Sequence, residues 1–509
     1  MLGDDTVELG EEMWAYIPKN ALPYLQYYAH TKYSHLYYVD GATLLFDASI
    51  GERDGCTVAT YYNCVKQDSV VDASNNIVPA NNTWRSVLIG GMGLGGASSS
   101  NCPEGSNCVQ TPLVDPGDAT KRLGYSSYFA LDVTNPKVPS LLWEFSNADL
   151  GYATSGPAII RVGEPDKNGH WFAVFGSGPT GPIEKEYSQF MGRSNQTLKF
   201  FVVNLRTGVL ERTIETGIEE AFAGSMVGGA IDSDRWNPNT TGNYQDDAIF
   251  VGYTKKSSGE TWTDGGVIRI LTHESSDVES WTWKPVVEDT GPVTTSIARL
   301  QDRKNKHLWL YFGSGRYYNR SGSSIDDYTT RRAIYGIKEP CYNTNAKPGN
   351  RLDKDCTATV ESGITNQSDS IEEVGAGGWK IDLDVSSTDY GAERVVTDAV
   401  ALTNGTVFLT SFQPTADPCG FGGNSFLWAL DYDSGGRPMD SALAGKALIQ
   451  LSTGEFKEVD LAQAFGSGSA RLNRRTSVPM TGKPPADAFP IVSKSGNKPV
   501  KRIMHIQER

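Results

Sequence analysis

Two kinds of apolar segment alternate along this chain and decide its fold. The first kind is an apolar run that ends in glycine, as in Ser86-Val-Leu-Ile-Gly90-Gly91 and Ala248-Ile-Phe-Val-Gly252. The second kind ends in aspartate or asparagine, as in Ser127-Tyr-Phe-Ala-Leu-Asp132 and Lys199-Phe-Phe-Val-Val-Asn204. Short runs of β-branched and aromatic residues that stop at Gly, Asn or Asp are typical of β-strands. The alternation therefore predicts pairs of adjacent strands.

The same pair recurs along most of the chain. Further copies cover residues 172–178, 266–271, 308–315, 333–337, 407–412 and 426–431, and short third strands are expected at 143–145, 210–213 and 281–283. A unit of three or four strands that repeats about every 60–90 residues is typical of propeller blades, because a small sheet with two apolar faces must pack both against neighbours. We expect an all-β fold, a six- to seven-bladed β-propeller of the quinoprotein-like kind with long loop insertions. An array of β-sandwiches is the alternative.

The ends of the repeat need separate interpretation. Residues 8–16 resemble the outer strand of a first blade that is incomplete, so its inner strands are expected either before residue 1 or from a C-terminal strand near residues 500–506. We expect the propeller to cover residues 1–480. Residues 481–509 are then a C-terminal extension that includes a possible closing strand.

Helical periodicity is scarce. Apolar residues three or four apart predict one short helix near the N-terminus, over about residues 18–31. A second, weaker helix is expected at 461–465.

Six of the seven cysteines form three close pairs in polar, loop-like stretches. The pairs are Cys56 with Cys64, Cys102 with Cys108, and Cys341 with Cys356, while Cys419 is left over. Disulfides that close small loops are the favoured interpretation and indicate an exported protein. Zinc ligation and unpaired surface thiols remain alternatives, although the spacings lack the short C-x₂-C pattern of structural zinc sites.

Composition excludes several classes of function. The formal net charge is −14, which argues against nucleic acid as a partner because phosphate binding needs a basic face. No apolar run is long enough to predict a transmembrane helix, and the acidic first residues do not resemble a signal peptide. The chain is therefore either cytosolic or a part of a longer exported precursor, and the cysteine pairs favour the second.

Several blocks of the sequence occur in an order that resembles one known family. The first blocks are Glu11-Glu-Met-Trp14-Ala-Tyr-Ile-Pro18, similar to an E-x-W-A-F-I-P segment, and the glycine-rich Trp84-Arg-Ser-Val-Leu-Ile-Gly-Gly-Met-Gly93-x-Gly95-Gly96. Tyr128-Phe-Ala-Leu-Asp-Val-Thr-Asn-Pro136 and Phe312-Gly-Ser-Gly-Arg-Tyr317 follow in the same order. Together these blocks resemble the C-terminal propeller of PilC/PilY-type proteins of the type IV pilus, from about residue 8 to about 435. The resemblance implies a longer precursor with a variable N-terminal region.

The resemblance also implies a calcium site. The stretch that begins Ile231-Asp232-Ser-Asp234 and ends at Asp247 is similar to the family's compact calcium loop, in which alternate Asp residues and a late carboxylate direct oxygens at one centre. Asp232 and Asp234 match the first ligands and Asp247 the late one. Six extra residues occur in the middle and the usual glycine is missing, so Asn237 or Asn243 must provide the third ligand. The family's final Asp is Tyr253 here. We therefore expect Ca²⁺ at Asp232, Asp234, Asn237 and Asp247, with a loop held only by its own turns as the alternative.

The implied function is that of a non-enzymatic type IV pilus biogenesis and tip adhesin protein, calcium-modulated, that promotes pilus assembly and surface attachment. Its expected partners are minor pilins and the pilus tip, the N-terminal part of the same precursor, and a host or abiotic surface ligand. Its expected location is extracellular, at the pilus tip or outer-membrane surface. The long insertions at 51–83, 97–124 and 340–373 are the expected partner-facing surfaces.

A PQQ-dependent dehydrogenase of the quinoprotein type is the alternative function. Segments such as Tyr128–Trp143 fit its A-L-D-x-x-T-G-x-x-x-W strand pattern, but no tryptophan-docking motif repeats in every unit and no adjacent cysteine pair is present. No spacing of carboxylates indicates a catalytic acid and base either, so no catalytic residue is assigned.

Overall fold

The computed structural model describes most of the chain in ordered segments. These are residues 12–33, 35–53, 55–67, 82–114, 122–184, 189–235, 244–259, 261–302, 304–321, 324–343, 351–415, 422–450, 456–466, 471, 473–482 and 492–494. Strands dominate them, and helices are few and short. The predicted all-β class is confirmed.

Three sheets form from the N-terminal half of the chain. The first has the order β1–β2–β5–β6 (Thr43–Ser49, Trp84–Gly91, Tyr128–Asp132, Ser140–Phe145). The second has the order β7–β8–β11–β12 (Pro157–Val162, His170–Gly176, Lys199–Asn204, Leu210–Glu215). The third has the order β13–β15–β16–β17, with β14 beside β15 (Ala221–Ala223, Ala248–Lys255, Asp264–Leu271, Thr282–Val287, and Ala230–Ile231 for β14).

Three further sheets follow. The fourth has the order β18–β19–β22–β26–β25 (Ala298–Asp302, His307–Gly313, Ala333–Lys338, Gly378–Asp382, Ile364–Asn366). The fifth has the order β27–β29–β30–β33, with β28 beside β29 (Arg394–Val395, Thr406–Pro414, Gly423–Asp431, Met480–Thr481, and Val400–Ala401 for β28). The sixth has the order β32–β31–β34 (Phe456–Asp460, Lys446–Gln450, Val492–Lys494).

Short elements decorate these sheets. Two-stranded ribbons pair β3 with β4, β9 with β10, β20 with β21 and β23 with β24 (Leu113–Val114, Arg122–Leu123, Gly181–Glu184, Gln189–Arg193, Asn319–Ser321, Ser324–Ile325, Tyr342–Asn343, Arg351–Leu352). The described helices are η1, η2, η4, η5 and α1 (Lys19–Ala29, Val58–Asn63, Val278–Ser280, Asp440–Leu443, Leu461–Ala464). None of them combines the length and the hydropathy that a membrane span requires.

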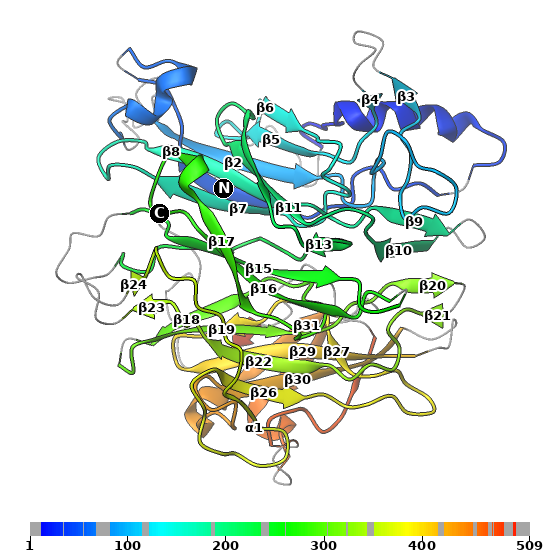
Figure 1. Cartoon of the computed structure of the whole chain (residues 1–509), viewed down its shortest axis with the longest axis vertical. Helices are drawn as coiled ribbons and strands as arrows, with labels where there is room; N and C mark the ends of the chain where they lie inside the picture. The colour runs from blue at the N-terminus through cyan, green and yellow to red at the C-terminus, as the bar shows by residue number, and fades with distance from the viewer. Residues whose placement is uncertain are drawn as a thin grey trace.

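Successive sheets pack face to face in chain order, from the first at the top of Figure 1 towards the C-terminal sheets at the bottom. Strand β8 shows why both faces are apolar. Phe175 stacks on Tyr128 of the first sheet at 4.0 Å between ring centroids, while Phe172 meets Trp281 beside the third sheet at 5.5 Å. Alternate side chains of one strand point to opposite faces, so a strand between two sheets must be apolar throughout. This accounts for the continuous apolar runs in the sequence. Closure of the sheets into a ring, the number of blades and the proposed domain boundary stay predictions.

Glycines near the ends of the glycine-terminated strands, such as β15 and β19, permit neighbouring sheets to pack closely. A Cβ on Gly252 of β15 would lie 2.4 Å from Val293, and one on Gly313 of β19 would lie 2.3 Å from Val395. Val293 precedes the fourth sheet and Val395 belongs to the fifth. A larger side chain at either position would push the next sheet away.

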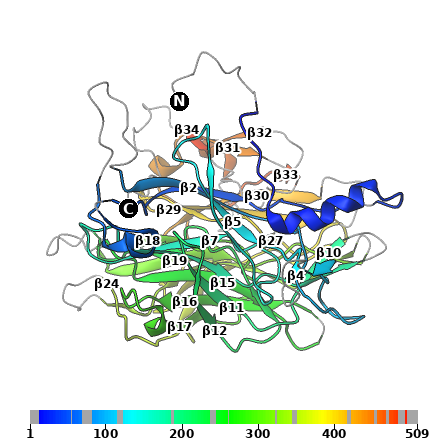
Figure 2. The ribbon, with the colours of Figure 1, turned by 90° about the horizontal axis from the view of Figure 1, so that it is seen from above.

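The N-terminal helix lies where the sequence predicts it, but as a 3-10 helix. Pro23 lies inside η1 and has no backbone N–H to donate. The helix runs along the outside of the molecule beside β4 (Figure 2), where the Tyr24 hydroxyl donates to the Gly124 carbonyl at 2.6 Å. The weaker predicted helix is present as α1.

The expected first strand is wrong over its described part. Residues 12–16 form no strand, because their polar groups bond to side chains and single carbonyls instead of to a ladder. The Trp14 indole donates to the Pro136 carbonyl at 2.9 Å, and the Tyr16 hydroxyl donates to Glu144. The expected closing strand near residues 500–506 lies outside the described residues.

The three cysteine pairs are confirmed as disulfides. Cys56 bonds to Cys64, Cys102 to Cys108 and Cys341 to Cys356, with Cα–Cα distances of 5.9, 5.7 and 5.6 Å. Cys419 lies outside the described residues.

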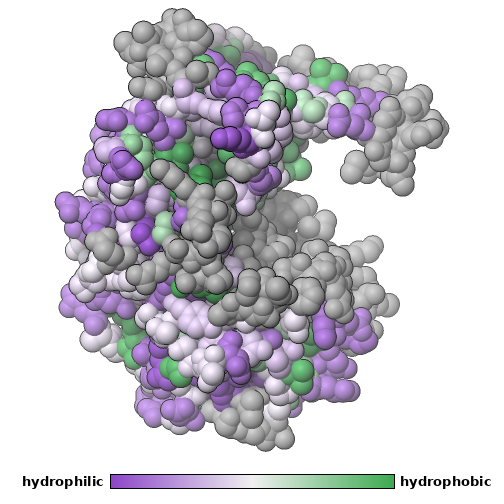
Figure 3. Space-filling model, turned by 90° about the vertical axis from the view of Figure 1, so that its right-hand side faces the viewer, coloured by the Kyte–Doolittle hydropathy of each residue, from purple (hydrophilic) through white to green (hydrophobic). Residues whose placement is uncertain are grey.

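Fully buried arginines hold several loops together. Arg316 is an example, donating to the carbonyls of Met191, Gly192 and Trp262 at 2.9, 2.8 and 3.1 Å. It therefore joins the β9–β10 ribbon to the segment before β16. The face of the molecule that carries this ribbon and β20–β21 is mostly hydrophilic or intermediate in hydropathy, with scattered hydrophobic patches (Figure 3).

Candidate metal centre

Two paired strands bring the ends of the predicted calcium loop together. Asp232 directly follows β14, and Asp247 directly precedes β15. The strands are antiparallel, with Ile231 opposite Ala248. The backbone N–H of Asp247 also donates to the Ile231 carbonyl at 2.7 Å. Residues fifteen positions apart in sequence thus become neighbours.

Three of the four predicted ligands converge. One carboxylate oxygen from each of Asp232, Asp234 and Asp247 lies within 4.8 Å of the others. Asp234 and Asp247 are 4% and 8% exposed, while Asp232 is partly exposed. Asn237 and the alternative Asn243 lie outside the described residues. Tyr253 is six residues beyond Asp247 on β15, about 20 Å away at the usual rise per strand residue, so it is remote from the cluster.

Hydrogen bonds fix one side of the cluster and leave other oxygens free of donors. Oδ2 of Asp247 accepts from the Ser233 backbone N–H at 2.6 Å and from the Ser233 hydroxyl at 2.7 Å. By contrast, Oδ1 of Asp232 and Oδ1 of Asp234 are buried and accept no hydrogen bond. Buried carboxylate oxygens are normally satisfied, so these two fit a site that a cation completes.

The electrostatics of the cluster agree with this geometry. Burial, followed by the charges of Asp246 and Asp234, raises the pKa of Asp232 to about 8. Burial and the charge of Glu274 raise the pKa of Asp234. Burial raises the pKa of Asp247 well above its ordinary value, although both hydrogen bonds from Ser233 oppose the shift. Without a cation, the negative charges of the three carboxylates repel one another and burial disfavours their ionised forms. A divalent cation between them would stabilise the ionised forms instead.

Oxygen-only donors of this kind suit a hard cation. Ca²⁺ takes six to eight oxygen ligands and tolerates irregular geometry, whereas zinc and other softer metals favour nitrogen and sulfur. The residues present can therefore hold calcium, which stays a prediction.

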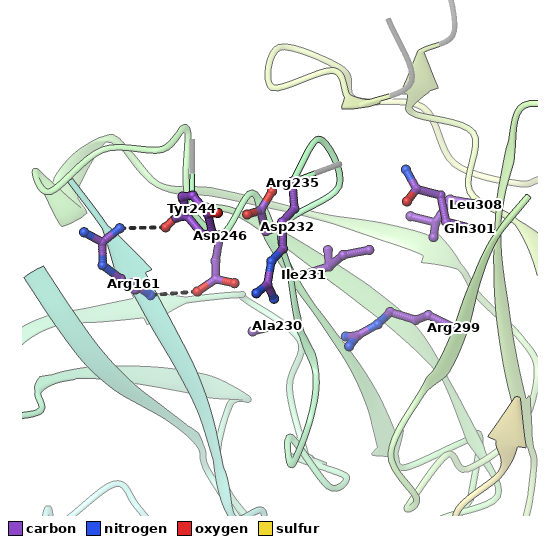
Figure 4. Close-up of a pocket in the computed structure, with 10 residues that line it drawn as sticks. All are labelled: Arg161, Ala230, Ile231, Asp232, Arg235, Tyr244, Asp246, Arg299, Gln301 and Leu308. Carbon is purple, nitrogen blue, oxygen red and sulfur yellow. Dashed lines mark hydrogen bonds between the residues drawn. The ribbon is translucent and has the colours of Figure 1, made fainter. Parts of the chain in front are cut away.

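A cavity of about 280 Å³ adjoins the cluster (Figure 4). Its lining residues are Arg161, Ala230, Ile231, Asp232, Arg235, Tyr244, Asp246, Arg299, Gln301 and Leu308. They come from β7, from β14 and the described residues between β14 and β15, and from β18 and β19, so the cavity lies where the second, third and fourth sheets meet.

Two contacts that the sequence does not predict position this loop. Oδ2 of Asp246 accepts from the backbone N–H of Arg161 at 2.7 Å, and Gln301 donates to the Ser233 carbonyl at 2.6 Å. The pair Asp246-Asp247 before a strand is a visible signal for the first contact. No local pattern announces Gln301, because it joins the loop through tertiary structure.

Comparison with known proteins gives homologues over most of the chain. A type IV pilus biogenesis factor PilY1 homolog of Xylella fastidiosa is 26% identical over 461 residues, which cover 84% of this chain and 25% of the relative. The type IV pilus biogenesis factor PilY1 of Pseudomonas aeruginosa strain UCBPP-PA14 is 22% identical over 497 residues, which cover 86% of this chain and 35% of the relative. No protein-family model matches the chain.

A solved structure supports the fold. The C-terminal domain of Pseudomonas aeruginosa PilY1 aligns with a TM-score of 0.50 and 17% identity, covering 93% of this chain and 83% of that one. The resemblance seen in the sequence is therefore confirmed: homologues named PilY1 match most of this chain. The chain spans about a quarter to a third of the length of these curated relatives.

Proposed function

We propose that this chain, whose homologues over most of its length are PilY1-type pilus biogenesis factors, is a non-enzymatic, calcium-binding module that promotes type IV pilus assembly and surface attachment. The observation that carries the calcium part is the convergence of Asp232, Asp234 and Asp247, with buried oxygens that lack donors. The names of the relatives support the pilus part. The quinoprotein alternative has the strand pattern of segments such as Tyr128–Trp143 in its favour, whereas the names of the relatives favour the pilus role.

The fold supports a role in assembly. The six sheets of three or more strands among the described residues are proposed to be blades of a propeller, whose rigid body presents loops to partners. Minor pilins at the pilus tip, the remainder of a longer precursor, and a host or abiotic surface ligand are the proposed partners. An extracellular place at the pilus tip or outer-membrane surface follows from these partners. The disulfides are compatible with it.

Calcium binding is tested directly by isothermal titration calorimetry of the purified, EDTA-treated chain. We expect a saturable heat with CaCl₂ in the wild type and none with Asp234→Ala, because removal of a buried ligand leaves the cation with too few oxygens. Asp166→Ala is the matched control, since Asp166 lies in a turn outside the cluster. Absence of calcium heat in the wild type would contradict the calcium part.

The pilus role needs the native strain. Deletion of the gene region that encodes this chain is expected to abolish surface pili, counted by electron microscopy, and the wild-type gene is expected to restore them. Complementation with Asp234→Ala tests whether calcium contributes. Full piliation in the deletion strain would overturn the assembly role while leaving calcium binding untouched.

A further inference from the structure

The outer side of helix η1 carries apolar side chains that face solvent. Residues three positions apart lie on the same side of a 3-10 helix. Leu22, Leu25 and Tyr28 form such a row, and they are 50%, 38% and 60% exposed. The buried residues of η1 are Asn20, Ala21 and Pro23. A surface helix normally turns its most apolar row towards the body of the protein. Helix η1 lies at the outer edge of the molecule (Figure 1, Figure 2), and the row that holds both of its leucines points away from the body.

Exposed aromatic side chains gather on the same stretch of the chain. Among the described residues six aromatic side chains are exposed, and five of them lie between residues 14 and 37. These five are Trp14, Tyr27, Tyr28, Tyr33 and Tyr37. Tyr28 stacks on Tyr38 at 5.0 Å and on Tyr33 at 5.3 Å between ring centroids, so the rings form one ordered group. Tyr and Trp combine an apolar ring with a polar tip and are favoured where an apolar phase meets water.

The charge of this stretch differs from that of the whole chain. Residues 13–39 contain no Asp or Glu, although the chain has 60 such residues in 509 and a net charge of −14. The same stretch holds Lys19 and Lys32. Glu144 lies beside the start of η1, where it accepts hydrogen bonds from the Tyr16 hydroxyl and the Lys19 backbone N–H. Charges farther away than about 8 Å are largely screened at physiological ionic strength. A negative surface against the outer side of η1 is therefore attracted by lysine and little affected by distant carboxylates.

The outward face of η1 is too small to hold a folded protein partner by itself. Its 11 residues, at about 2 Å rise each, give a length of about 22 Å. With a width of about 10 Å the face covers roughly 220 Å². A stable protein interface takes about 800 Å² from each partner, so a second copy of the chain would need much more surface than this face offers. A lipid surface has no such threshold, because binding grows with each apolar side chain that enters it and with attraction to anionic headgroups.

We propose that the outer face of η1 docks on an anionic lipid surface. Leu22, Leu25 and Tyr28 enter the headgroup region, and the exposed Lys32 contacts the lipid phosphates. The neighbouring tyrosines then lie at the level of the headgroups, where their rings are buried and their hydroxyls stay wet. This inference goes beyond the proposed function and does not depend on the calcium site.

Vesicle cosedimentation of the purified chain tests the inference. One set of vesicles is phosphatidylcholine with a quarter of phosphatidylglycerol, and the other is phosphatidylcholine alone. EDTA is present throughout, so that calcium cannot bridge lipid and protein. We expect the anionic vesicles to retain the chain at least threefold more strongly than the neutral ones, and Lys32→Glu to reduce retention at least twofold.

A double variant and its matched control locate the contact. Leu22→Gln/Leu25→Gln should weaken retention about fivefold or more, because it removes two of the three apolar side chains of the row. Its melting temperature should equal that of the wild type, since both side chains face solvent. Val209→Gln/Met439→Gln changes apolar side chains that are 55% and 71% exposed elsewhere on the molecule and should leave retention unchanged.

The outcomes decide between a lipid surface and a protein partner. Absence of wild-type retention on both vesicle types, or equal retention of the wild type and the leucine variant, overturns the inference. Equal retention on neutral and anionic vesicles overturns the anionic class. A dimer in light scattering that the leucine variant abolishes, without vesicle retention, assigns the face to a second copy instead. Because EDTA is present throughout, each of these failures leaves the calcium and pilus proposals standing.

Discussion

Arg269 and Glu339 form a buried ion pair that joins the third and fourth sheets. Both side chains are fully buried, and Nη1 of Arg269 bonds Oε1 of Glu339. Nη2 of Arg269 also donates to the Ala358 carbonyl at 3.1 Å, while the same Glu339 oxygen accepts from the Cys341 backbone N–H at 2.8 Å. Substitution Arg269→Met removes the positive charge, keeps most of the side-chain volume and leaves a buried carboxylate with one backbone donor.

The expected loss of stability for Arg269→Met is about 3–5 kcal/mol at pH 8, the range for a buried pair that loses one partner. Burial already raises the pKa of Glu339, and loss of Arg269 raises it further. A carboxyl whose pKa is higher in the folded state contributes most stability below its unfolded pKa, and that contribution is lost as pH rises through the folded pKa. The destabilisation should therefore be smaller at pH 5 than at pH 8.

Guanidinium unfolding followed by tryptophan fluorescence measures both effects, with the transition midpoint and slope compared at the two pH values. The double variant Arg269→Met/Glu339→Gln should recover part of the loss, because it removes the buried charge as well. Arg437→Met is the surface control and should change stability by less than about 1 kcal/mol. A loss within about 1 kcal/mol for Arg269→Met at pH 8, or a larger loss at pH 5, would refute the reasoning.

Three further predictions concern the cluster, a disulfide and a sheet. EDTA should lower the melting temperature of the calcium-loaded wild type but not that of Asp234→Ala, as measured by scanning calorimetry. Bound ligand at a hundred times its Kd adds about 2.7 kcal/mol to the free energy of unfolding. Equal changes in melting temperature for the two proteins would contradict the site. Replacing Cys341 and Cys356 by Ser opens a loop of sequence separation 15 and should cost about 3 kcal/mol in denaturant unfolding. Gly336→Ala would place a Cβ 2.3 Å from the Trp379 ring and should lower the free energy of unfolding by about 1–3 kcal/mol, measured by the same method. A variant as stable as the wild type would show that β22 and β26 can move apart to accept the methyl group.

Local sequence patterns predict the strands because each strand has a local cause. Residues 248–252 and 333–337 are apolar throughout since each lies between two packed sheets, and both strands were predicted near their observed positions. The expected strand at 8–16 shows the limit. Its apolar and aromatic residues suit a strand, but residues 12–16 form no ladder, and single contacts such as that of Trp14 with the Pro136 carbonyl take its place.

The sequence predicts the ligand residues of the candidate site, but it does not predict the residues from other sheets that surround them. Alternate aspartates beside a short strand are a local signal, and Asp232, Asp234 and Asp247 do converge. Arg299 is more than 50 residues away, so its place beside the loop depends on sheet packing. Arg269 could have been suspected, because an arginine inside the apolar run 266–271 must find a buried partner. Nothing local identifies Glu339 as that partner.

The position of the cluster indicates what a bound cation would do mechanically. Asp246 beside it receives the backbone N–H of Arg161 from the second sheet, and the Ser233 carbonyl receives Gln301 from the fourth. The Ser233 hydroxyl, which holds Asp247, in turn accepts from the backbone of Leu352 at 3.0 Å. A cation that draws the three aspartates together therefore tightens a loop already bonded to sheets on both sides. If calcium binds as proposed, it would therefore act on the packing between the second, third and fourth sheets as well as on one loop.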